Sequence, residues 1–149
     1  MKLEDEIKQK NFKSEIHKLA VNIIYTHSWF NSFQEKLLGK NNITTQQYNI
    51  LRILRGQYPN PATINLLKER MLDKMSDASR LVERLRVKEL VKRKNCEQDR
   101  RRAEVIITQK GLDVLKELED LEEEVSEIFS NISEVEAKTV NDIMDKMRG

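Results

Sequence analysis

Glycine, proline, cysteine and aromatic residues are all scarce in this chain of 149 residues, which contains 4 Gly, 2 Pro, 1 Cys and 5 % aromatic side chains. So few glycines and prolines, beside 35 % charged residues, argue against a β-sandwich and favour a helix-rich protein. The length suits one domain, or one core with long helical extensions, and argues against a multidomain enzyme.

Long apolar runs are absent as well. No stretch of about 18 apolar residues occurs, so the sequence predicts no membrane-spanning helix. The first residues, MKLEDE, are charged where a signal peptide needs an apolar segment. Cys96 has no second cysteine to pair with, which agrees with a reducing compartment. We therefore expect a cytoplasmic protein.

Residue patterns with catalytic or metal-binding chemistry are also missing. The sequence has no glycine-rich phosphate loop and no nucleophile with an evident base. His17 and His27 would lie about 80° apart on one helix, an arrangement that does not favour a shared metal. We therefore expect a protein that is not an enzyme and that holds no metal or cofactor.

The net charge of +2 hides a strong segregation along the chain. Residues 1–67 carry a net charge of +4, residues 68–102 carry +6, and residues 103–149 carry −8. Such asymmetry predicts a basic middle that faces a polyanion and an acidic C-terminal third that is kept away from it. On charge alone, solvated helix faces explain the same pattern equally well.

Apolar residues recur at spacings of three and four near both ends of the chain, which predicts long helices there. The first should span about residues 4–38 and end at Gly39. Thr108 can cap a second, and Ser133 with Glu136 forms a capping box that begins a closing helix. Little of the neighbouring chain is available to cover the first apolar stripe, so we expect it to pack against a partner subunit. The stripe of the first helix consists of Phe12, Ile16, Leu19, Ile23, Phe30, Phe33 and Leu37.

The middle of the chain predicts three short helices and a hairpin. Thr44 and Gln47 form a capping box that begins the first helix, and the glycine and prolines of residues 56–61 end it. Asn60 or Thr63 can cap the second, and Asp73 can cap the third, which spans about residues 76–90. Residues 90–94 and 103–108 are rich in Val and Ile and predict two strands, joined by a charged tip.

The third short helix separates into an apolar face and a polar face on a helical wheel. The apolar face consists of Ala78, Leu81, Val82 and Leu85, and the polar face consists of Ser76, Ser79, Arg80, Glu83 and Arg84. One face can therefore pack while the other stays free to bind. Two consecutive helices of this kind followed by a hairpin are typical of a winged helix-turn-helix.

Four stretches in order resemble the MarR family of bacterial transcriptional regulators: SRLVERL at 79–85, LVKR at 90–93, DRR at 99–101 and ITQKG at 107–111. The resemblance covers nearly the whole chain and implies a single, mainly α domain with a small β-hairpin wing. The winged helix-turn-helix would span 43–108, between dimerisation helices at 1–38 and 109–149. One departure is Glu89, where the family usually has glycine. A left-handed residue there costs about 1 kcal/mol without glycine, so we expect this turn to differ in shape.

The resemblance implies that the helix beginning near Ser76 enters the major groove of DNA. Arginine can pair with guanine O6 and N7, so Arg80 and Arg84 are candidate base readers. Ser76 and Ser79 can bind phosphate or base edges. Two alternatives stay open, because Arg80 could instead bridge to Asp99 and Arg84 could contact a phosphate.

At the wing, the resemblance assigns Arg101 to the flanking minor groove, where a narrow groove concentrates negative potential. Arg100 and Arg102 would contact phosphates or remain solvated, and Asp99 would orient a neighbouring arginine. Cys96 lies close to Lys92, Arg93 and Lys94, and nearby cations favour a thiolate. Redox sensing by Cys96 is therefore a hypothesis that the sequence leaves open.

Members of the family often sense small aromatic compounds in a cleft between the dimerisation helices and the DNA-binding region. Tyr25, Trp29, Phe30 and Tyr48 could line such a cleft, although core packing explains the same residues. The sequence thus predicts a homodimeric regulator that represses transcription from a palindromic operator in double-stranded DNA, relieved by a small aromatic effector. The alternative is a winged-helix protein-interaction module whose basic face binds an acidic partner.

Overall fold

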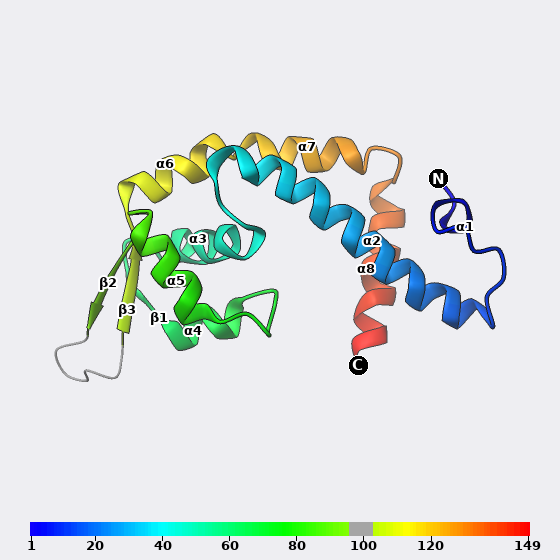
Figure 1. Ribbon diagram of the computed structural model, residues 1–149, viewed down its shortest axis with the longest axis horizontal. Coiled ribbons are helices and arrows are strands. Elements are labelled where there is room, and N and C mark those ends of the chain that lie inside the picture. The colour runs from blue at the N-terminus through cyan, green and yellow to red at the C-terminus, as the bar shows by residue number, and fades with distance from the viewer. Residues whose placement is uncertain (96–102) are drawn as a thin grey trace.

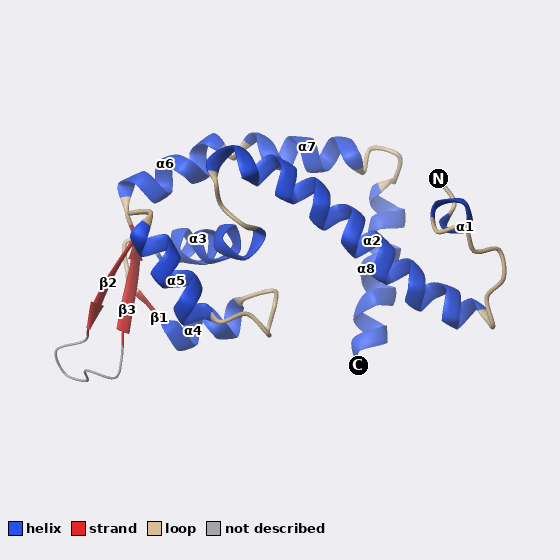
Figure 2. Cartoon of the chain, viewed as in Figure 1, coloured by secondary structure: helices blue, strands red, loops and turns tan. Residues whose placement is uncertain are grey.

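The computed structural model describes residues 1–95 and 103–149, and most of them are helical (Figures 1 and 2). The helices are α1 (Leu3–Glu6), α2 (Glu15–Leu38), the 3-10 turn η1 (Gly39–Asn41), α3 (Thr45–Gln57), α4 (Ile64–Arg70), α5 (Ala78–Val87), α6 (Gln109–Glu117), α7 (Asp120–Ile128) and α8 (Glu134–Arg148). The strands are β1 (Ala62–Thr63), β2 (Val91–Asn95) and β3 (Ala103–Ile107). This architecture confirms the predicted mainly α fold with a small β-hairpin. In the described part of the chain, no helix is both long and apolar enough to span a membrane.

A winged-helix lobe, formed by α3, α4, α5, α6 and the three strands, lies at one end of the molecule (Figure 1). The strands form an antiparallel sheet in the order β1-β3-β2, in which Val91 pairs with Ile107 and Ala62 pairs with Val105. Burial alternates along β3, so one face of the sheet covers the core of the lobe. The hairpin of β2 and β3 was predicted within one residue at each end, whereas β1 was not.

Side-chain caps begin the helices where the sequence predicts them. Thr44 and Gln47 form both halves of a capping box at α3, and Ser133 and Glu136 do the same at α8. The hydroxyl of Thr63 accepts from the N–H of Leu66, and that of Thr108 accepts from the N–H of Gly111. These local signals therefore fix the starts of α3, α4, α6 and α8.

The predicted single helix over residues 4–38 is wrong, because the chain breaks between α1 and α2. Lys8 has a left-handed φ of 55°, and Ser14 caps α2 by accepting from the N–H of His17. A serine side chain that bonds the backbone in this way favours a helix start over a helix interior. Leu3 is buried, and Glu4 pairs with Lys18 at 2.5 Å, so α1 is held against α2.

Two further helix ends differ from the prediction. Gly39 follows α2 as predicted but stays right-handed, and the left-handed residue that ends the η1 turn is Asn42, at φ 55°. The helix that begins after Thr108 is interrupted between α6 and α7 at Leu118 and Glu119. Leu118 is buried in the core of the lobe, and Val125 on α7 packs against that core from beyond the interruption.

Candidate nucleic-acid interface

Helix α5 is amphipathic in the way its sequence predicts. Ala78, Val82 and Leu85 are buried and hold the helix against the lobe. Ser79, Arg80 and Arg84 are exposed on the remaining surface of the helix. The packed face fixes the helix, so the polar face is held in a defined orientation toward solvent.

The start of α5 differs from the prediction. The cap is Asp77, whose Oδ1 accepts from the N–H of Arg80 at 3.0 Å, and the helix begins at Ala78. Asp73 instead closes the preceding turn, because its Oδ1 accepts from the N–H of Met75 at 2.9 Å and its Oδ2 accepts from the Ser76 hydroxyl at 2.7 Å. These two donors lower the pKa of Asp73 below its ordinary value, and the Ser76 hydroxyl has the larger effect. Ser76 therefore lies before the helix, and its hydroxyl already donates to a carboxylate.

Acidic side chains on α5 could repel phosphates, but each is engaged within the protein. The carboxylate of Asp77 caps the helix. Glu83 accepts from Nε of Arg86 and from its Nη2 at 2.7 Å, and this bonding, with a smaller effect from Arg93, lowers the pKa of Glu83. In the described part of the chain, the guanidinium groups of Arg80 and Arg84 have no acidic partner. The cations thus dominate the exposed surface of this helix.

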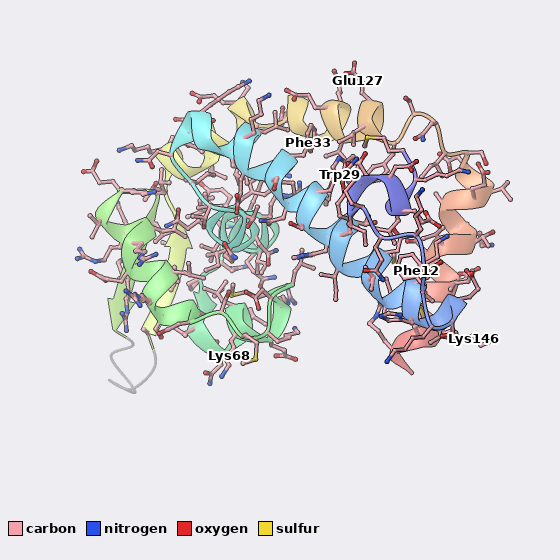
Figure 3. All side chains as sticks on the ribbon, turned by 45° about the vertical axis from the view of Figure 1, so that its right-hand side comes forward. Phe12, Trp29, Phe33, Lys68, Glu127 and Lys146 are labelled. Carbon is pink, nitrogen blue, oxygen red and sulfur yellow. The ribbon has the colours of Figure 1, made fainter. Side chains whose placement is uncertain are left out.

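More cations lie on the elements next to α5. Lys92, Arg93 and Lys94 are all exposed on β2. Figure 3 shows Lys68 pointing outward from α4 at the lower edge of the lobe, toward which the hairpin also extends. The predictions for Cys96, Asp99, Arg100, Arg101 and Arg102 lie outside the described residues, as does the alternative bridge from Arg80 to Asp99.

No protein-family model and no curated protein matches the chain, but solved structures do. A MarR transcription factor from Planctomyces limnophilus gives a TM-score of 0.69 at 25 % identity, covering 93 % of this chain and 98 % of its own. A mutant MarR from E. coli, solved with operator DNA, gives 0.76 at 21 % identity over 93 % and 99 %. The organohalide-sensing regulator RdhR, solved with 2,4-dichlorophenol, gives 0.83 at 19 % identity over 94 % and 85 %. The chain has the fold of the MarR family.

The turn from α5 into the wing keeps its left-handed geometry in this MarR fold even though glycine is missing. Glu89 has a φ of 63°, so the expectation of a differently shaped turn is wrong. The Thr108 hydroxyl donates to the Glu89 carbonyl at 2.8 Å, and the Lys110 ammonium lies 3.0 Å from the Glu89 carboxylate. These contacts from the start of α6 stabilise a conformation that Glu89 alone would disfavour.

Gly111 allows that close approach between the start of α6 and the turn. A Cβ on Gly111 would lie 2.3 Å from the Leu90 carbonyl oxygen and 2.7 Å from Cγ1 of Ile107. Both distances are too short for any side chain. The glycine at the end of the ITQKG stretch is therefore a packing requirement, which the sequence analysis did not identify.

The predicted aromatic pocket is only partly assembled. The ring centroids of Trp29 and Phe30 lie 6.4 Å apart, and both rings pack against Phe129, which follows α7. Tyr25 instead donates to Glu6 at 2.9 Å, and the Tyr48 hydroxyl accepts from Arg52 at 3.0 Å. Phe129 was missed because its partners lie on α2, about a hundred positions earlier in the sequence.

A hollow of about 420 Å³ lies elsewhere, between the C-terminal end of α5 and the turn that joins α2 to α3. It is lined by Gly39, Asn42, Ile43, Thr44, Gln47, Arg84, Val87 and Lys88. The lining includes two cations and no acidic residue. None of these residues belongs to the predicted aromatic pocket.

Proposed function

We propose that this protein is a homodimeric MarR-type transcriptional regulator that binds a palindromic operator in double-stranded DNA and represses transcription. The observation that carries the proposal is α5, whose apolar face is buried while Ser79, Arg80 and Arg84 are exposed. A helix held in this way suits the major groove, which admits one helix and presents guanine acceptors that pair with arginine.

The distribution of charge also supports DNA binding through this face of α5. The acidic residues of α5 are engaged by the helix start and by Arg86, so they add little repulsion toward a phosphate backbone. Lys92, Arg93 and Lys94 extend the positive surface along β2. Binding to DNA through such a surface should weaken steeply as the salt concentration rises, because the Lys and Arg side chains release counterions from the DNA phosphates when they bind.

Dimerisation is proposed from the apolar side chains that the single chain leaves exposed. Ile16 and Ile24 on α2 are 75 % and 71 % exposed, and Val135 and Ile143 on α8 are 76 % and 50 % exposed. A second copy related by a two-fold axis would cover these side chains. Two copies of α5 would then meet half-sites about 34 to 36 Å apart, which requires a palindromic operator.

A small aromatic effector is proposed for the cluster of Trp29, Phe30 and Phe129. The solved structure of RdhR holds 2,4-dichlorophenol, which supports a ligand of this chemistry. The indole N–H of Trp29 would offer a polar contact beside an apolar surface. Binding there would change the DNA affinity if the effector alters how α2 lies relative to the lobe.

Selection of tight binders from a random duplex pool, at about 0.15 M salt, tests the proposal. We expect an enriched palindrome with half-sites about 10 base pairs apart. The Arg80→Ala variant should relax the preference at one position in each half-site, at about 1 to 3 kcal/mol. Arg101→Ala should flatten the salt dependence, and Lys10→Ala, which removes an exposed cation far from α5, should change neither.

One result would contradict the proposal, and another would change the role given to Arg80. If no sequence is enriched, the DNA-binding function fails, and the basic face becomes a candidate surface for an acidic protein. If Arg80→Ala weakens binding equally to all sequences, Arg80 contacts phosphate and does not read a base.

A further inference from the structure

One lysine joins the end of α5 to the turn between α2 and α3. Lys88, the C-cap of α5, donates from Nζ to the main-chain carbonyl of Asn42 and to Oε1 of Gln47, which lies 3.3 Å away. The partners are 46 and 41 positions apart in the sequence. The bonds are therefore tertiary links between two distant parts of the chain.

We call the contact between the end of α5 and the α2–α3 turn the joint. Both acceptors of Lys88 are held in place by further contacts. Gln47 is 2 % exposed and is the one buried polar side chain among the described residues, and its Oε1 also accepts from the N–H of Thr44 at 3.2 Å. Asn42 is left-handed and donates its N–H to the Gly39 carbonyl at 3.0 Å. Lys88 thus bonds to one group in the turn that follows α2 and to another at the start of α3.

Apolar packing does not fill this joint. The hollow of about 420 Å³ separates the last turn of α5 from the α2–α3 turn, and Val87, beside Lys88, is 71 % exposed. Buried side chains such as Val82 and Leu85 fix the other side of α5. Beside the buried contact of Leu85, the two bonds of Lys88 therefore link the C-terminal end of α5 to the α2–α3 turn and to the start of α3.

We infer that Lys88 is a positioning residue that fixes the angle between α5 and the long helix α2, and so sets the half-site spacing that the dimer accepts. The inference rests on the proposed function, because it requires two copies of α5 that enter successive major grooves. A rigid joint makes binding sensitive to the distance between half-sites. Loss of the lysine bonds makes the joint more compliant without removing a contact to DNA.

The Lys88→Met variant tests this inference, because methionine keeps an unbranched side chain and removes all three donors. Its affinity is measured for the selected operator and for operators with one base pair inserted or removed between the half-sites. We expect about tenfold weaker binding to the selected operator, as suits the loss of charged hydrogen bonds. We also expect a several-fold smaller penalty for the altered spacings, and an unchanged dependence of affinity on salt.

Lys40→Met is the matched control. Lys40 is an exposed lysine of η1, and its side chain makes no hydrogen bond or ion pair with the described residues. The variant removes the same charge from the same joint and should match the wild type in all three measurements. If Lys88→Met does not fold, Lys88→Gln replaces it, because the shorter side chain cannot reach both acceptors.

The outcomes separate the inference from the proposed function. If the wild type enriches no palindrome, the proposed function fails and the inference fails with it. If the wild type binds a palindrome and Lys88→Met keeps the full spacing penalty, only the inference is overturned. Equal weakening at every spacing, with a salt slope smaller by about one, would make Lys88 a phosphate contact and overturn the positioning role.

Discussion

The winged-helix lobe and the outer helices α1, α2, α7 and α8 differ in how completely they bury their apolar side chains. Every buried apolar residue described, apart from Leu3, lies between Leu37 and Leu118. Helix α8 buries none, although Val140, Ile143 and Met147 recur along it. The lobe, together with the last turn of α2, therefore has a complete core, whereas the outer helices present apolar side chains that a single chain does not cover.

Charge also differs between the middle of the chain and its C-terminal third. The segment of residues 68–102, which contains α5 and β2, has a net charge of +6, whereas residues 103–149, mostly in α6, α7 and α8, carry −8. A polyanion is thus attracted to the segment that contains α5 and β2 and repelled by the C-terminal segment. These differences support the proposal that the lobe contacts DNA and that the outer helices form the dimer interface.

The largest expected effect follows from breaking the core of the lobe. Leu51 on α3 is 0 % exposed, so Leu51→Ala should lower the free energy of unfolding by about 2 to 5 kcal/mol through the lost transfer energy and the cavity. Leu72→Ala, at a leucine that is 86 % exposed, should change it by less than about 0.5 kcal/mol. Urea denaturation measures both. Equal effects of the two variants would show that the lobe does not hold the stability of the chain.

A charge introduced among the exposed apolar residues of α8 tests whether the outer helices form the dimer interface. Burying an isoleucine side chain in the interface contributes about 1.5 to 3 kcal/mol to the free energy of dimerisation. In a two-fold dimer each substitution is present in both copies, so its effect is doubled. Ile143→Glu should therefore weaken the dimer at least about a hundredfold in sedimentation equilibrium while the lobe stays folded. Asn141→Glu adds the same charge outside the apolar stripe and should dimerise like the wild type. A wild type that is monomeric at all concentrations would contradict the role given to the outer helices.

Features governed by neighbouring residues could be predicted from the sequence. The caps at Thr44, Thr63, Thr108 and Ser133 each bond a backbone N–H three positions away, so their residue types reveal them. The two faces of α5 follow from helical periodicity, which needs no knowledge of the rest of the fold. The helix-turn-helix and its wing follow from the order of such elements.

Features governed by distant residues could not be predicted. Asp73 and Asp77 are both good caps by residue type, and the bond from Ser76 to Asp73 commits Asp73 to the turn. The left-handed Glu89 depends on Thr108 and Lys110, which lie about 20 positions away. The bonds of Lys88 connect elements more than 40 positions apart, and no local pattern marks them.

A third prediction concerns the backbone strain at Glu89. Glycine adopts a φ of 63° without strain, whereas alanine adopts it at a cost, so Glu89→Gly should be more stable than Glu89→Ala by about 1 kcal/mol. Both variants lose the ion pair with Lys110, so their difference isolates the backbone. At Lys116, inside α6, the order should reverse, with alanine more stable than glycine by about 1 kcal/mol. The same order at both positions would mean that Glu89 is not strained.

The smallest expected effect is a pH dependence from the turn before α5. Because the Ser76 hydroxyl and the Met75 N–H donate to the Asp73 carboxylate, its pKa in the folded protein lies below the ordinary value of 3.8. A carboxylate with a lowered folded pKa stabilises the fold at pH values above its unfolded pKa, and this stabilisation is lost as the pH falls through the folded pKa. Asp73→Ala should therefore be slightly less stable than the wild type at neutral pH, and the difference in Tm should shrink once the pH falls below about 3.8. If the difference grows on acidification instead, the bonds in this turn do not favour the charged form of Asp73.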